Sequence, residues 1–335
     1  MKLKFWLDNA RMVALPQSVL PALCAVCWAV PTGCFHLLSA ALAVVGVAAA
    51  HLCANLLDDY FDYRNAGIES RERLQRAGMR ARIGKANYLA EGRATLEETL
   101  RAACCFGVVA LAAGLYVFFH WQTSPSMRGG WPVVLLAGAG GLLAYFYSAK
   151  PLMLCYRGLG ELTTGLIFGP LLMAGMAYAS CGMVPTAIWP LSVAVGLLVV
   201  NILYTHSIMD ADPDRSVGKT TLATLLATSR RMLAASFCFC FLPYVCVACS
   251  VPVGGWGVLA TVVTLPAAVG LYRLMVSYTS TEGILPEEQP RWWMGPMPNW
   301  EAIEAAGIGW FMLRWYLARN LLGGFVVLLA LAAFL

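Results

Sequence analysis

Residues 36–64, HLLSAALAVVGVAAAHLCANLLDDYFDYR, join a long apolar run to a cluster of acidic residues. An α-helix needs about 20 apolar residues to cross the hydrocarbon core of a membrane, and the part of this stretch before Asn55 has about that length. The acidic part begins where such a helix would leave the lipid. The stretch therefore predicts a transmembrane helix that carries polar groups at one end.

The whole chain is likewise rich in hydrophobic residues and poor in charged ones. Of its 335 residues, 60% are hydrophobic and 12% are charged, whereas soluble domains have about 45–50% and about 25%. This composition excludes a soluble globular domain and a disordered chain. A net charge of +5 would favour a nucleic-acid partner only if the basic residues were clustered on a soluble face, so we expect no nucleic acid.

Nine apolar runs near the required length predict an all-α integral membrane protein, with nine transmembrane helices in a single domain of residues 1–335. The expected spans are 12–32, 36–57, 101–119, 131–148, 160–180, 186–209, 232–252, 254–276 and 318–335. A Val-Pro-Val-Gly-Gly turn separates the seventh span from the eighth.

The basic residues indicate how these spans are oriented. When nine spans alternate across the membrane, every Lys and Arg except Arg128 falls on one side. Cytoplasmic loops of membrane proteins carry an excess of Lys and Arg. We therefore expect a multi-pass protein of the bacterial cytoplasmic (inner) membrane, with its amino terminus in the cytoplasm and its carboxyl terminus outside. All 18 acidic residues also fall on or next to the cytoplasmic side, which places the polar chemistry there.

This orientation predicts which engineered cysteines a membrane-impermeant thiol reagent reaches in intact cells. In a variant whose 12 native cysteines are replaced, Arg80→Cys, between the second and third spans, is protected, and Arg128→Cys is labelled. Labelling at position 80 without cell lysis would contradict the orientation.

The acidic cluster of the opening stretch lies on one helix face. At about 100° per residue, the four polar positions of this cluster fall within an arc of about 100°. These positions are Asn55, Asp58, Asp59 and Asp62. Three carboxylates and one amide are therefore expected to converge.

A second acidic cluster closes the sixth span, in residues 210–222, DADPDRSVGKTTL. His206, Asp210 and Asp214 follow one another at intervals of four residues. Pro213 is expected to end or kink the helix, so that Asp214 lies about one turn beyond it.

Carboxylates this close together repel one another, and near lipid they are costly unless they are paired or hold a cation. Carboxylates, waters and phosphate oxygens are the ligands that Mg²⁺ prefers, so two such clusters predict a Mg²⁺-bridged diphosphate. The expected catalytic residues are Asn55, Asp59, Asp62, Asp210 and Asp214; the four aspartates among them and Asp58 are the expected metal ligands. Asp58 and Asp212 fit solvated helix-end charges equally well. The expected diphosphate-binding residues are Arg215, Lys219, Arg82 and Lys85.

Both clusters resemble the two aspartate-rich motifs of the UbiA superfamily of intramembrane aromatic prenyltransferases. The residues that carry the resemblance are Asn55-xxx-Asp59-xx-Asp62 and Asp210-xxx-Asp214-Arg215-xx-Gly218-Lys219-x-Thr221-Leu222. Within that superfamily the chain is most similar to the 1,4-dihydroxy-2-naphthoate polyprenyltransferases. The supporting stretches are Gly67-Ile-Glu69, Tyr147-Ser-Ala-Lys150-Pro and Tyr156-Arg157-Gly-Leu-Gly160-Glu161. The chain departs from that branch at Asp58, where Asn is usual, and at Glu69, where Asp is usual.

The resemblance implies a nine-helix bundle with its active site on the cytoplasmic side. It implies that Mg²⁺ holds a polyprenyl diphosphate between the motifs, and that the polyprenyl group passes to an aromatic acceptor. For 1,4-dihydroxy-2-naphthoate, in menaquinone biosynthesis, this transfer is accompanied by loss of CO₂. The expected acceptor-binding residues are Tyr147, Lys150, Arg157 and Glu161, for which anchoring at the membrane interface is an equal alternative.

Three alternatives stay open at this point. The acceptor could instead be 4-hydroxybenzoate, homogentisate, haem, a lipid or a sugar. A secondary transporter would place its acids near the middle of the membrane, on broken helices, whereas here they lie at the ends of spans. The tryptophan-rich residues 280–317 predict an aromatic belt at the lipid headgroups, with a lid over the site as the other interpretation.

Overall fold

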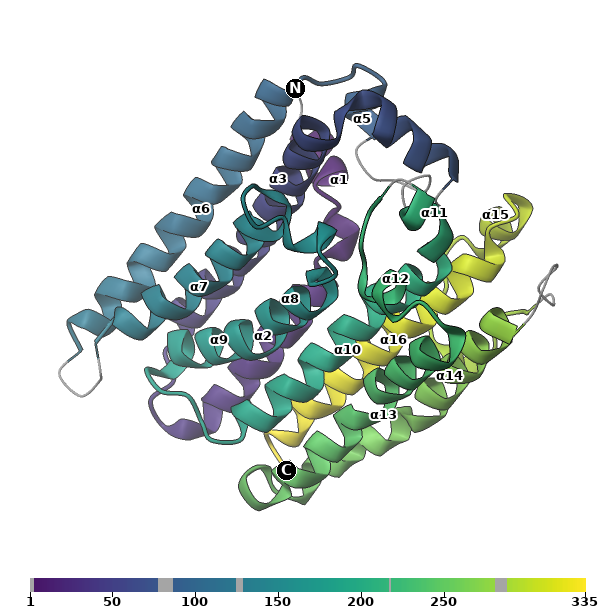
Figure 1. Cartoon of the computed structure of the whole chain (residues 1–335). Helices are drawn as coiled ribbons and strands as arrows, with labels where there is room; N and C mark the ends of the chain where they lie inside the picture. Colours follow the sequence, from purple (N-terminus) through teal and green to yellow (C-terminus); the bar gives the residue numbers. More distant parts are fainter. Residues whose placement is uncertain (1–2, 78–86, 125–128, 217, 281–287) are drawn as a thin grey trace.

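A computed structural model of the protein describes residues 3–77, 87–124, 129–216, 218–280 and 288–335, with the backbone alone over 66–77. These residues form a bundle of long helices that run roughly along one direction (Figure 1). The helices that make up the bundle are α2 (Pro16–Ala29), α3 (Leu37–Ala77), α6 (Leu96–Gln122), α7 (Trp131–Ser148), α8 (Gly160–Leu166), α9 (Leu172–Cys181), α10 (Ile188–Met209), α13 (Ser229–Gly254), α14 (Leu265–Ser280) and α16 (Gly309–Ala332).

Short elements lie before the first of these helices, in the connections between them and, for η4 and η5, within a span. They are α1 (Leu3–Asn9), α5 (Asn87–Ala90), α11 (Ala211–Ser216), α12 (Leu222–Leu226) and α15 (Trp300–Ala305), with helical turns η1 (Met12–Ala14), η2 (Val30–Thr32), η3 (Leu154–Tyr156), η4 (Ile167–Leu171), η5 (Trp256–Thr264) and η6 (Trp292–Met294). Local sequence explains several boundaries. For example, α6 begins at a capping box, in which the Thr95 and Glu98 side chains each accept a hydrogen bond from the other residue's backbone N–H.

Among the described residues, eight helical segments are long and apolar enough to cross a membrane. They are Leu37–Asn65, Leu96–Gln122, Trp131–Ser148, Gly160–Cys181, Ile188–Met209, Ser229–Gly254, Trp256–Ser280 and Gly309–Ala332. The prediction of an all-helical membrane protein is confirmed. The predicted first span, 12–32, falls on η1, α2 and η2, and α2 has 14 residues, too few for the same length criterion.

The last predicted span, 318–335, was placed too far along the chain, because α16 begins at Gly309. The start of this helix is difficult to predict from the sequence, because Arg314 interrupts the apolar run. Its guanidinium is buried, and it donates hydrogen bonds to the backbone oxygens of Leu274 and Trp310 and to the Glu288 carboxylate. Because the hydrogen bonds of the Arg314 guanidinium are made within the protein, its charge does not end the helix.

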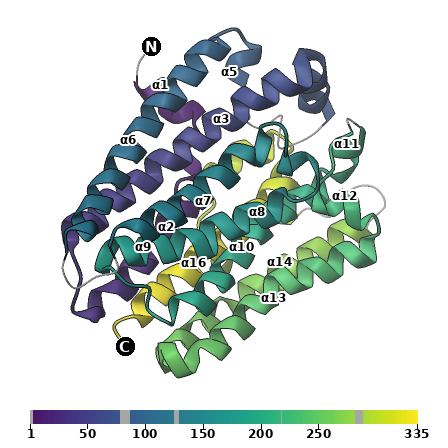
Figure 2. The ribbon, with the colours of Figure 1, turned by 60° about the vertical axis from the view of Figure 1, so that its left-hand side comes forward.

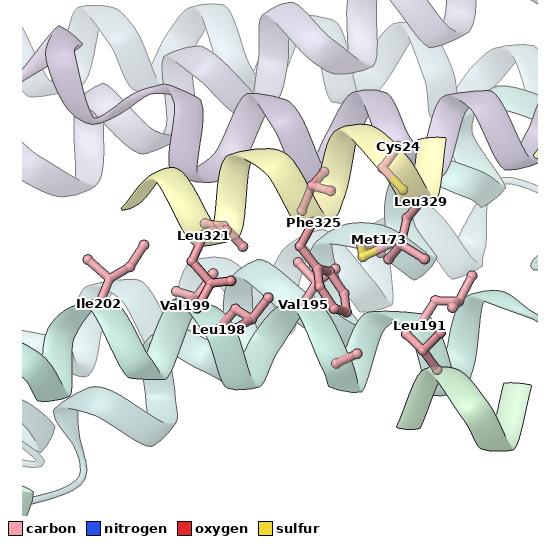
Figure 3. Packing of buried hydrophobic residues seen from close by; sticks show 14 of the residues in the cluster. Cys24, Met173, Leu191, Val195, Leu198, Val199, Ile202, Leu321, Phe325 and Leu329 are labelled. Carbon is pink, nitrogen blue, oxygen red and sulfur yellow. The ribbon is translucent and has the colours of Figure 1, made fainter. Parts of the chain in front are cut away.

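The core of the bundle is built around α10, whose side chains are buried along almost its whole length. Apolar side chains of α16 project onto α10 in Figure 3, which labels Val195, Leu198, Val199 and Ile202 of α10 and Leu321, Phe325 and Leu329 of α16. Lipid tails are as apolar as these side chains, so tight van der Waals packing, more than exclusion from water, holds such helices together.

One close helix contact involves a π-helical turn, η4, that interrupts the fifth span between α8 and α9. Pro170 lies in this turn and has no N–H to donate. A Cβ added at Gly169 would lie 2.5 Å from the Ser192 backbone oxygen and 2.6 Å from the Gly196 Cα. Only glycine at position 169 allows η4 and α10 to approach this closely.

This contact predicts that Gly169→Ala destabilises the bundle. Overpacking of a tight contact costs about 1–3 kcal/mol, so the apparent melting temperature in detergent falls. Gly138→Ala is the matched control, since a Cβ at that position has no neighbour within 4 Å. Equal melting temperatures for both variants and the wild type would contradict the contact.

Candidate active site

The two predicted acidic clusters lie at the same end of the bundle. The carboxyl-terminal part of α3 and the short helix α11 are neighbours there in both views (Figures 1 and 2). Four side chains of the clusters are almost completely buried: Asp59 (0% exposed), Asp62 (3%), Asp210 (6%) and Asp214 (5%). Buried carboxylates need partners, and each cluster has its own set.

Among the described residues, Arg11 pairs with the carboxylates of the first cluster. It lies between α1 and η1 with a φ of 59°, and its guanidinium donates to Asp59 Oδ1 and to the Asn55 backbone oxygen, both at 2.9 Å. A second contact joins it to Asp58 at 3.5 Å. The Asn55 amide in turn donates to the Ala10 carbonyl at 2.9 Å. Burial alone would lower the pKa of Arg11, but Asp59 and Asp58 raise it above its ordinary value, so the residue stays charged.

Two tyrosines donate hydrogen bonds to the same carboxylates. Tyr156 Oη donates to Asp62 Oδ1 at 2.7 Å, and Tyr88 Oη lies 3.5 Å from Asp59 Oδ2. Burial, followed by the neighbouring carboxylates, raises the pKa of both phenols. Both tyrosines therefore stay protonated and neutral at physiological pH, and they hold the acids without adding charge.

Asp58, for which two interpretations were open, lies next to Asp62. Possible ligand atoms of Asp58, Asp62 and Cys155 lie within 4.8 Å of one another. The Ser148 hydroxyl donates to Asp58 Oδ1 at 2.5 Å and lies 3.4 Å from the Cys155 sulfur. The two carboxylates suit a hard cation such as Mg²⁺, whereas the thiol does not.

The second cluster forms where α10 ends. The helix stops at Met209, and a new short helix, α11, carries Asp214. A break was expected at Pro213, but it comes before that residue, which lies in the first turn of α11, where proline is tolerated. Lys219 Nζ donates to both carboxylate oxygens of Asp214, at 3.1 and 3.3 Å. Arg215 instead pairs with Asp212 on the surface, where the Asp212 side chain is 91% exposed. Asp212 therefore stands apart from the buried acids.

The predicted acceptor residues occupy different environments. Glu161 is buried and accepts from the Ser207 hydroxyl at 2.7 Å and from the Leu222 N–H at 3.2 Å, so it ties α8 and α10 to the segment after the second cluster. Lys150 and Arg157 are exposed. Tyr147 lines the cavity described next. The predicted phosphate ligands Arg82 and Lys85 lie outside the described residues.

A cavity of about 1180 Å³ extends from the first acidic cluster into the bundle. Most of its lining is apolar and comes from α3, α6, α7, the fifth span, α10 and α16. Its polar lining includes Asp8, Arg11, Gln17, His51, Asn55, Asp58, Tyr147, Thr164, His206, Tyr316 and Arg319. Trp315, one of the tryptophans assigned to a membrane belt, also lines this cavity. The cavity has the size and the apolar character needed for a hydrocarbon chain with a polar head.

Several residues at this site were not identified as site residues from the sequence. Arg11 is 48 positions from Asp59, and it was interpreted as one of the basic residues that set the orientation. Tyr88 and Tyr156 carry no signal of their own, because a tyrosine near a span end is ordinary. Tyr156 adjoined Arg157 in the stretch that supported the family resemblance, which is the one indication that pointed to it.

Arg11→Gln is predicted to destabilise the protein, because it removes the guanidinium that pairs with the fully buried Asp59 carboxylate at 2.9 Å. Removal of one partner of a buried ion pair costs about 3–5 kcal/mol. We expect the lower end of that range, since the Arg11 side chain is 22% exposed. The measurement is chemical unfolding in detergent without added divalent cations.

Arg215→Gln provides the control, since it breaks the surface pair with Asp212, and exposed pairs contribute about 1 kcal/mol or less. If both substitutions lowered the free energy of unfolding equally, the Arg11–Asp59 pair would have no special role in stability.

Comparison with known proteins confirms the family that the acidic motifs resemble. A model of the UbiA prenyltransferase family matches residues 18–294. The 1,4-dihydroxy-2-naphthoate octaprenyltransferase of Escherichia coli (strain K12) is 27% identical over 223 residues, which cover 66% of this chain and 68% of that protein. The protein of the same name from Mycobacterium tuberculosis is 26% identical over 239 residues, which cover 68% of this chain and 72% of that protein.

A solved structure supports the same fold. A UbiA homolog from Archaeoglobus fulgidus, bound to GPP and Mg²⁺, aligns with a TM-score of 0.58 at 16% sequence identity, over 94% of this chain and 98% of that one. Since the family model covers most of the sequence, the chain belongs to the UbiA prenyltransferase family and is a multi-pass membrane enzyme that transfers prenyl groups.

Proposed function

We propose that the protein transfers a polyprenyl group from polyprenyl diphosphate to 1,4-dihydroxy-2-naphthoate, with Mg²⁺ as its cofactor, in menaquinone biosynthesis. The observation that carries the proposal is the placement of two buried acidic clusters at one end of the bundle, where the first cluster opens into an apolar cavity. The names of the curated relatives favour the naphthoate over other aromatic acceptors.

The acidic residues are chemically suited to Mg²⁺. Asp58 and Asp62 bring carboxylate oxygens close together, and Asp59, Asp210 and Asp214 supply further hard oxygen ligands at the same end. When bound, Mg²⁺ neutralises charge on the diphosphate and makes it a better leaving group. Tyr88 and Tyr156 donate hydrogen bonds to Asp59 and Asp62, while Arg11 and Lys219 offset part of the negative charge of the two clusters.

The basic residues near the clusters would bind the rest of the diphosphate. Lys219 already contacts Asp214, and a short movement of its flexible side chain would bring its ammonium to a phosphate oxygen. Arg215 has its guanidinium at the surface beside the same turn. Arg82 and Lys85 are proposed to contribute from the connection between α3 and α6, on the strength of the sequence alone.

The cavity supplies the remaining requirements of the reaction. Its apolar walls would hold the polyprenyl tail and exclude water, which would otherwise capture the allylic cation. The aromatic acceptor would lie at the polar end, within reach of Tyr147. Lys150, Arg157 and Glu161 remain predicted acceptor-side residues; the first two are exposed, and Glu161 already has hydrogen-bond partners. We further propose that this end faces the cytoplasm, in a bacterial inner membrane.

The function predicts Mg²⁺-dependent prenylation by the purified protein in lipid vesicles. Labelled polyprenyl diphosphate is supplied with 1,4-dihydroxy-2-naphthoate, 4-hydroxybenzoate or homogentisate. We expect product with the naphthoate only in the presence of Mg²⁺. Asp59→Ala and Asp210→Ala are each expected to lower turnover by about 10²-fold or more, the scale seen when one electrostatic contact to the transition state is lost.

Asp212→Ala is the matched control, because this aspartate belongs to the same sequence motif and its side chain is exposed to solvent. It is expected to retain turnover close to that of the wild type. Prenylation that continues without Asp59 and Asp210 would contradict the proposed site. Prenylation of a different acceptor would contradict the naphthoate assignment and leave the reaction class intact.

A further inference from the structure

His51 is a cavity histidine that neither acidic cluster uses. It lies on α3 one helical turn before Asn55, and both residues line the same cavity together with Asp58. The side chain is 8% exposed. At about 1.5 Å per residue, His51 lies about 10 Å along the helix axis from Asp58. This distance leaves room for a diphosphate at the acids and an aromatic ring beside the imidazole.

The hydrogen bonds of Ser18, on α2, indicate which nitrogen of His51 carries the proton. The Ser18 hydroxyl lies 3.1 Å from the Leu15 carbonyl, to which it donates its one hydrogen, and 2.7 Å from His51 Nδ1. Both contacts are hydrogen bonds only if Nδ1–H is the donor to the serine oxygen. The lone pair of the neutral imidazole is then on Nε2, to which no described residue donates a hydrogen bond.

The imidazole ring also packs against a second aromatic side chain. The Phe168 ring packs against it with ring centroids 5.1 Å apart and an angle of 44° between the planes. Phe168 comes from the π-helical turn η4 and lines the same cavity. Ser18 and Phe168 together set the direction of Nε2, as expected for a basic nitrogen that is oriented by a second group.

We propose that His51 is a catalytic acid–base residue, which takes the hydroxyl proton of the aromatic acceptor at Nε2 and later returns it. The inference rests on the proposed function and deepens it. An aromatic ring with an adjacent hydroxyl attacks more readily when that hydroxyl loses its proton, because the oxygen lone pair then feeds electrons into the ring. No acidic residue of the two clusters is required for this step.

For an acceptor with a carboxylate next to the hydroxyl, the transfer proceeds through a β-keto acid. The ring carbon that bears the carboxylate bonds to C1 of the prenyl group, and the C1–O bond breaks so that its electron pair leaves with the diphosphate. The hydroxyl proton passes to Nε2 and the hydroxyl becomes a ketone. The resulting β-keto acid loses CO₂, the released electron pair forms an enolate, and Nε2 returns the proton to the oxygen.

The test compares two substitutions of His51 with different hydrogen-bonding capacity. His51→Asn keeps a side-chain donor near the position of Nδ1, and so keeps the contact with Ser18, but it has no base. His51→Gln places an amide near Nε2 that can accept a hydrogen bond but cannot take the proton. Ser18→Ala leaves the imidazole and removes the residue that orients it.

We expect both His51 variants to lower kcat for the naphthoate by about 10²–10⁴-fold, the usual contribution of general acid–base catalysis. KM for polyprenyl diphosphate and the melting temperature are expected to stay near those of the wild type. Ser18→Ala is expected to lower kcat less than either. A His51→Asn protein that turns over within threefold of the wild type would overturn the role, as would a loss confined to KM or to melting temperature.

A measurement on the wild type keeps the inference testable if the variants do not fold. Single-turnover prenylation is expected to slow in D₂O, because a proton moves as the ring attacks; equal rates in H₂O and D₂O would overturn the role. A wild type that prenylates no aromatic acceptor would contradict the proposed function itself. If the wild type were active and His51→Asn were equally active, only the role of His51 would be contradicted.

Discussion

The structure depends on burying acidic side chains at the edge of a membrane-spanning bundle. Asp59 has no exposed surface, and its pair with Arg11 at 2.9 Å compensates for the loss of hydration that burial imposes. This pair draws the amino-terminal segment across α3, where the Asn55 amide binds the Ala10 carbonyl. On the other side, Lys219 brings the loop after α11 back onto Asp214. The connections at this end are therefore shaped by the partners that the acids require.

One continuous helix, α3, connects the chemistry at this end to the apolar interior. His51, Asn55 and Asp58 lie on its cavity side over about two turns, so a substrate that binds its diphosphate at the acids would extend its hydrocarbon along the same wall. The close approach of α10 and η4 at Gly169 positions the adjoining part of the wall, including Phe168, which packs against His51. Small residues such as Gly169 allow the helices to pack tightly. Apolar residues line the cavity beside this contact.

The sequence allowed the fold class, eight of the nine spans and both acidic clusters to be predicted, because apolar length and acidic spacing are local properties of the chain. A break after the sixth span could be predicted for the same reason, although it lies before Pro213 and not at it. Contacts between distant segments could not: nothing near Arg11 indicates that it binds Asp59, and nothing near Tyr156 indicates that it binds Asp62. The start of α16 was misplaced because a buried Arg314 and a solvated arginine look alike in a sequence. Glu161 was identified as a site residue, but spacing alone could not indicate that its carboxylate already binds Ser207 and Leu222.

We propose that the two acidic clusters together form a single site for a metal-bound diphosphate. The most direct measurement is equilibrium binding of a non-hydrolysable polyprenyl diphosphate analogue to the protein in vesicles, with and without Mg²⁺. We expect Mg²⁺ to strengthen binding, and we expect Asp62→Asn and Asp214→Asn each to remove this strengthening even though they belong to different clusters. Binding whose Mg²⁺ dependence survives either substitution would show that one cluster acts alone, and it would contradict the account.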